Sequence, residues 1–226
     1  MGTSELTETT IRYLFAPEWL PTDTTEIKVA VPGGSTKAID TAGNLLHIAM
    51  WNLRRHGLMD FEQLRPFEEE YVRVLGGPSF SRYTVLHASP SLPGLEGALL
   101  RAAAELESPD NLIDRGILRT ADEDRHGVRR LVRALDLHHK GPWTTVCNKC
   151  FTEANAAGLV GVAGSRLFGQ KVVITDQAAF DALRERHDKL RAARGAYLEA
   201  EPELTQAVIG DCLRTVIDAY SPRLGD

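Results

Sequence analysis

Residues Pro142 to Asp176 read PWTTVCNKCFTEANAAGLVGVAGSRLFGQKVVITD and carry the clearest folding pattern in the chain. From Trp143 to Ala157, apolar or small residues recur at the spacing of one helix face. Gly158 then ends this helix, because glycine enters the left-handed cap conformation at little cost. Two extended runs follow, and the glycines between them let the chain turn back. The pattern therefore predicts a helix, a glycine stop and a β-hairpin, as in a winged-helix-like module.

A second segment, residues 36–87, shows the same order of features. Ser35 can cap a helix with a broad apolar face, and this helix is predicted to stop at Gly57. Extended runs farther along the segment can form a second hairpin. Segments 36–87 and 142–176 thus form two possible helix–hairpin repeats, which share a pattern rather than sequence identity.

The other patterns predict mostly helix. Residues 1–34 are interpreted as an amino-terminal arm, with a loose tail over residues 1–10. Residues 35–226 are interpreted as a single helical domain, because no low-complexity segment or long linker divides them. The predicted fold class is mainly α with small β-hairpins, in one compact helical domain. Helices are predicted at residues 60–70, 94–107, 109–119, 122–137, 176–201 and from 202 onward, and strands at 25–31, 71–75 and 82–87.

Composition limits the function classes. The chain has 226 residues, 43% of them hydrophobic and 25% charged, as is typical of globular proteins. Its net charge of −5 gives no general attraction to nucleic acid or anionic membranes, so any anion site must be local. No apolar run approaches the roughly 18 residues of a membrane-spanning helix. The polar start MGTSELTETT is unlike a secretory signal, and we expect a cytoplasmic protein, with peripheral binding at a membrane surface left open.

Cys147 and Cys150 form a CxxC motif, which can be a redox pair or half of a zinc site. His138 and His139 lie just upstream as further candidate ligands. However, the chain has no second CxxC, and both thiols fall on the apolar face of their helix. Buried cysteine packs as a small hydrophobic residue. We therefore expect packing and no metal or other cofactor, with a metal or redox role for the two cysteines as the alternative.

The most suggestive cluster is basic. Arg129, Arg130 and Arg133 follow one another at helical spacing, and Lys140 comes shortly after them. Guanidinium groups hold phosphate through paired hydrogen bonds. Trp143 can add an apolar anchor of the kind found in proteins that bind membrane surfaces. These five residues are the predicted anion or headgroup site, and a solvated helix face is the alternative.

A second basic set, on the predicted helix 176–201, is interleaved with acidic residues. Its spacing is typical of a solvated face with salt bridges. His47 and His187 lie on partly apolar helix faces and are expected to be core or boundary residues. The basic residues of this set are Arg184, Arg186, Lys189, Arg191 and Arg194.

From Leu95 onward, the order of features resembles the Golgi phosphoprotein 3 family in its short bacterial form. The resemblance is carried by GLEGALLRAAAE, RRLVRAL, KGPWTTVCNKCFTEANAAGLV, SRLFGQKVVITD, QAAFDALRERHDKLRA and ELTQAVIGDCL, and earlier by LLHIAMWNLRRHGLMDF. The arm up to Pro32 and the strands after Asp60 depart from the family pattern. The resemblance implies a mostly helical domain that binds a phosphoinositide headgroup through arginine and tryptophan, without catalysis. On this chain it points to the arginine cluster above and Trp143.

The sequence therefore predicts a non-enzymatic binding protein for an anionic phospholipid headgroup or an acidic protein partner. It contains no GxSxG, P-loop or HExxH motif. A tandem winged-helix regulator that binds nucleic acid is the alternative. It is disfavoured because the predicted recognition helix at 142–158 offers only Lys149 as a basic residue. The oligomeric state, including a homo-oligomer, stays open.

Overall fold

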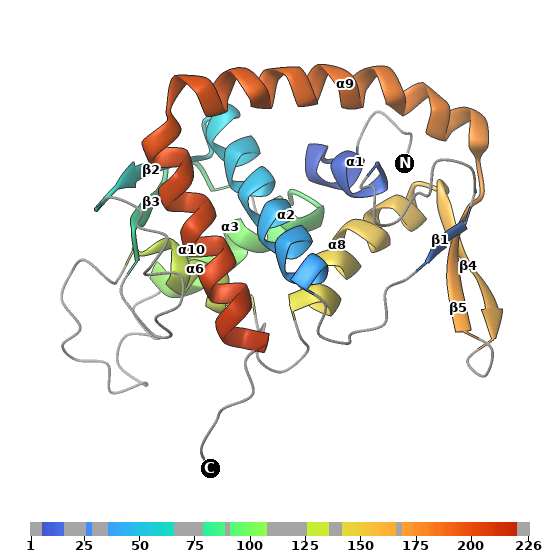
Figure 1. Cartoon of the computed structure of the whole chain (residues 1–226), viewed down its shortest axis with the longest axis horizontal. Coiled ribbons are helices and arrows are strands. Elements are labelled where there is room, and N and C mark those ends of the chain that lie inside the picture. The colour runs from blue at the N-terminus through green and yellow to red at the C-terminus, as the bar shows by residue number, and fades with distance from the viewer. Residues whose placement is uncertain are drawn as a thin grey trace, which may run out of the picture.

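The computed structural model describes residues 6–15, 26–28, 36–65, 79–88, 91–107, 126–135, 142–165 and 169–220. Within these ranges the chain is mainly helical with two small antiparallel sheets, which confirms the predicted fold class (Figure 1). The helices are α1 (Glu8–Leu14), α2 (Thr36–Arg55), α3 (Gly94–Glu107), α6 (Val128–Arg133), α8 (Pro142–Ala156), α9 (Gln177–Ala200) and α10 (Pro202–Tyr220). The strands are β1 (Glu26–Lys28), β2 (Met59–Gln63), β3 (Ser81–Val85), β4 (Val160–Ser165) and β5 (Gly169–Ile174).

Helix α2 forms the centre of the hydrophobic core. It contacts α1, α3, α8 and α10, and its Leu45, Leu46 and Met50 are almost completely buried. Full burial of one such side chain stabilises the fold by about 1.5–3 kcal/mol. Helix α9 runs along one edge of the molecule, past α2 and α1, and α10 then packs back along α2 (Figure 1). None of the described helices is long and apolar enough to cross a membrane.

Both predicted glycine stops are present. Gly57 and Gly158 have φ angles of 66° and 75°, which favour glycine over residues with a Cβ. The next residue donates its backbone N–H back to the helix in each case, Leu58 to the Leu53 carbonyl at 2.9 Å and Leu159 to that of Ala154 at 3.1 Å. This hydrogen bond belongs to the Schellman motif that ends helices. The strand that follows each glycine joins an antiparallel pair, β2–β3 or β4–β5.

The region after Gly57 corrects one prediction. Residues 60–70 were expected to form a short acidic helix, but Met59–Gln63 is strand β2, which pairs with β3. The physical reason is a two-residue alternation: Met59 and Phe61 are buried while Asp60 and Glu62 are exposed. The predicted strand 71–75 and helix 109–119 lie outside the described residues.

The amino-terminal arm corrects a second prediction. The loose tail was expected to reach residue 10, but α1 begins after Thr7, whose side chain caps it. Glu153 accepts hydrogen bonds from the hydroxyls of Thr7 and Thr10 at 2.8 and 2.6 Å. The buried Glu96 accepts from the Thr9 hydroxyl at 2.6 Å. Two carboxylates distant in sequence therefore hold the start of α1 against α3 and α8.

Candidate functional site

Two arginines of the predicted cluster, Arg129 and Arg133, form ion pairs within the protein. Arg129 is 2% exposed, and its guanidinium donates to the carboxylate of Asp218 on α10. Arg133 donates to the same carboxylate at 3.3 Å, with its own side chain 40% exposed. Burial, together with Arg133 and Arg214, lowers the pKa of Arg129. Asp218 thus ties α6 to α10, and the expected placement of Arg129 on an anion-binding surface is corrected.

Of the other members of the predicted site, Arg130 and Arg133 lie within the described residues. Arg130 is half-buried on α6. Lys140 lies outside the described residues, and so does the side chain of Trp143, although its backbone belongs to the first turn of α8. The structure therefore brings Arg129 and Arg133 together, but on a shared carboxylate.

Cys147 and Cys150 are packed in the core, at 4% and 0% exposure. Burial raises the pKa of both thiols well above the ordinary value, so neither is a ready thiolate nucleophile or ligand. No cluster of His, Cys, Asp and Glu within the described ranges could hold a metal ion. The candidate ligands His138 and His139 lie outside those ranges. The expected packing role fits the positions of both cysteines.

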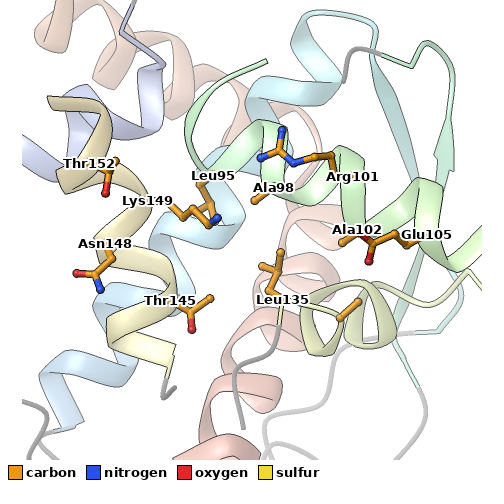
Figure 2. A pocket seen from close by; sticks show the side chains of 11 residues that line it. Leu95, Ala98, Arg101, Ala102, Glu105, Leu135, Thr145, Asn148, Lys149 and Thr152 are labelled. Atoms are coloured by element: carbon orange, nitrogen blue, oxygen red, sulfur yellow. The ribbon is translucent and has the colours of Figure 1, made fainter. Parts of the chain in front are cut away.

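A cavity of about 420 Å³ lies beside the predicted region, between α3, α6 and α8. Figure 2 shows Lys149 of α8 and Arg101 of α3 among its lining side chains, with Leu135 after the end of α6. Arg101 donates to the Leu92 carbonyl at 3.4 Å, and the carboxylate of Glu105 is part of the same lining. The charges of this cavity are therefore mixed.

A second cavity, of about 250 Å³, lies between α1, α2 and α9, and we call it the arginine cavity. Three arginine residues line it, Arg12 of α1 and Arg191 and Arg194 of α9. Residues 191 and 194 share one helix face because they are three positions apart. Glu8 is the acidic residue of the lining, and its carboxylate pairs with Arg55. Among the described lining residues, positive charge therefore exceeds negative charge.

Arg194 differs from most buried arginines in the partners of its guanidinium group. One terminal nitrogen lies 3.2 Å from Nδ1 of His47 and 3.4 Å from Oδ1 of Asn44. Its Nε is buried without a hydrogen-bond acceptor, and no carboxylate of the described chain forms an ion pair with it. Burial, with a contribution from Arg12, lowers its pKa. Within the described residues, the fold thus holds the partly buried Arg194 against neutral hydrogen-bond partners and near a second cation, Arg12.

The histidines beside these arginines are held neutral. Burial and the nearby Arg194 lower the pKa of His47 to about 3. The neutral ring can therefore accept a hydrogen bond at Nδ1 from the Arg194 guanidinium. Burial and Arg12 lower the pKa of His187. Its Nε2 lies 3.0 Å from the Arg12 guanidinium and its Nδ1 3.3 Å from Asp188. This arrangement fits a neutral ring that accepts from Arg12 and donates to Asp188.

The prediction that His47 and His187 are core or boundary residues is confirmed, because they are 1% and 8% exposed. The cavity around them was not predicted. Arg191 and Arg194 were interpreted as part of a solvated face, and Arg12 as part of an arm. A glycine in the interior of the long helix, Gly195, was the available signal, because it interrupts a strong helical pattern beside both arginines.

Comparisons of the chain with protein-family models, curated proteins and solved structures found no match. The case for a function therefore depends on the geometry and charge of the described residues.

Proposed function

We propose that this chain is a binding protein that holds an anionic group in the arginine cavity. The observation that supports this proposal is the convergence of Arg12, Arg191 and Arg194 on one cavity, where Arg194 has no carboxylate partner within the described chain. The anionic ligand expected from the sequence is kept, and its place moves from the 125–143 region to the space between α1, α2 and α9.

Withdrawing a cation from water costs several kcal/mol unless an opposite charge or good hydrogen bonds compensate. Neutral His47 and Asn44 offer Arg194 only partial compensation. A bound oxyanion 4 Å from a guanidinium gains about 4 kcal/mol of Coulomb attraction at the effective dielectric of a partly buried site. The planar guanidinium fork also matches the geometry of carboxylate and phosphate oxygens.

Thermal unfolding in inorganic phosphate, at constant ionic strength against chloride, tests the proposal. We expect phosphate to raise the Tm of the native chain, because a ligand that binds only the folded state stabilises it. Arg194→Gln and Arg191→Gln should remove most of that shift. Lys189→Gln is the matched control, since it removes the same charge from the same helix at an exposed ion pair with Glu185.

A phosphate shift that persists in both arginine variants, or no shift in the native chain, would contradict the proposal. A lipid headgroup and a soluble anion share the same oxyanion chemistry, so a second arm separates them. If the anion is a lipid headgroup, the native chain should sediment together with phosphatidylserine vesicles. The variant that combines Arg191→Gln with Arg194→Gln should stay in solution. If the native chain stays in solution while phosphate protects it, the ligand is a soluble anion.

A further inference from the structure

The lining of the arginine cavity also includes an apolar wall. Ile48 and Trp51 come from α2, and Leu190 and Leu198 come from α9. The Trp51 ring is held in place by the Arg55 guanidinium, 5.2 Å from its centroid, and by Tyr197 at 6.1 Å. An inorganic ion would leave this wall unused. The lining therefore matches a ligand with a charged end and an apolar body.

Gly195 keeps space open beside this wall. It lies in the interior of α9, and a Cβ built on it would have no other atom within 4 Å. Alanine would fit there, and glycine is a poor helix former compared with alanine. No crowding around Gly195 accounts for glycine at this position. A gap preserved on the lining of a ligand cavity does account for it, because even a small side chain at Gly195 would fill part of that gap.

We propose that the ligand of this cavity is a small amphipathic acid, an aromatic or short aliphatic carboxylate. Its carboxylate would bind Arg191 and Arg194, and its apolar body would lie against Trp51 in the space beside Gly195. The volume of about 250 Å³ is smaller than the roughly 300–1,000 Å³ of sites for drug-sized ligands, which favours one ring or a short chain. This inference rests on the proposed function, because it specifies the anion.

Calorimetric titration with acetate, benzoate, octanoate and benzylamine tests the inference on the full chain. Benzoate and octanoate should bind at least about tenfold more tightly than acetate, since burial of apolar surface adds to the same charge contact. Benzylamine has the same ring with the opposite charge and should not bind. Gly195→Leu should reduce benzoate affinity to that of acetate, because the added side chain would fill the space for the apolar body.

Ala192→Leu adds the same side chain at an exposed position of the same helix and should leave benzoate binding unchanged. Gly195→Ala is a milder variant that should fold at least as well as the native chain. Phosphate protection combined with benzoate no tighter than acetate would overturn the inference and leave the anion site standing. So would unchanged benzoate affinity in Gly195→Leu. If phosphate does not protect the native chain, the proposed function itself fails.

Discussion

The arginine side chains of this protein differ in what faces them. Arg54 donates to Glu201 at 2.6 Å and to Asp60 at 2.9 Å, and Arg129 donates to Asp218. These guanidinium groups are compensated by carboxylates of the same chain, so they connect elements of the fold. Arg194 is faced by a neutral imidazole and an amide. The difference separates arginines paired with carboxylates of the same chain from the arginine that we propose binds a ligand.

Asp218→Ala should destabilise the chain by about 3 kcal/mol, because it leaves the buried Arg129 without its carboxylate. Urea unfolding followed by circular dichroism measures the loss. Arg133→Ala should cost less than 1 kcal/mol, since that side chain is 40% exposed. Equal costs for the two variants would show that the Arg129–Asp218 contact does not support the fold.

His47 should make the fold sensitive to acid. Its folded pKa of about 3 is below the unfolded value of 6.5, so the folded state binds fewer protons between these two pH values. Its contribution to the free energy of unfolding is complete above pH 6.5 and falls by about 1.4 kcal/mol per pH unit below that pH. Urea unfolding from pH 7 to 4.5 in chloride should therefore show a shallower decline for His47→Gln than for the native chain.

Asp211 acts in the opposite direction, because burial raises its pKa to about 6 although it accepts hydrogen bonds from Phe80 and Ser81. A raised carboxyl pKa makes the folded state bind more protons between about pH 4 and 6. Asp211 is present in the native chain and in His47→Gln. Its effect therefore cancels when the free energies of unfolding of these two chains are subtracted. Parallel pH profiles of the native chain and His47→Gln would contradict the neutral, buried state of His47.

Among the elements, those with a strong local pattern could be predicted from the sequence. Helix α3 spans the predicted residues 94–107, and Asp176 caps α9 by accepting from the Ala179 amide at 2.9 Å. Elements stabilised by partners distant in the sequence could not be predicted in this way. Helix α1 depends on Glu96 and Glu153, and the arginine cavity joins Arg12 to a histidine 175 residues away. Local spacing carries no information about such contacts.

The same substitution should have opposite effects on two elements. Gly158→Ala should destabilise the chain by about 1 kcal/mol, because φ of 75° strains a residue with a Cβ. Gly195→Ala should stabilise it by about 0.5–1 kcal/mol, because the position is helical and its surroundings are open. Urea unfolding of the two variants gives both values. Destabilisation by Gly195→Ala would show that the gap beside α9 is smaller than the structure indicates.

At the scale of the whole molecule, a chain of net charge −5 has a cavity whose described lining includes three arginines and one glutamate. The arginine cavity joins α1, near the start of the chain, to α2 and to α9, which lies along the edge of the molecule (Figure 1). A ligand bound there would contact three separate elements and so stabilise their packing by linkage. Anion binding was expected from the sequence and stays a proposal, whereas the arginine cavity could not be predicted because its groups meet only after folding.

The most direct test of the anion site is an NMR titration of the arginine Nε–H signals with inorganic phosphate at constant ionic strength. A bound oxyanion beside the Arg194 guanidinium should change the electrostatic environment of its Nε–H group and so move that signal saturably. Arg191 should respond with the same affinity. Arg184, exposed on the same helix near Asp181, should respond only as ordinary salt would make it respond. A fixed Arg194 signal across the titration, or an equal and unsaturable drift of all three signals, would contradict the anion site.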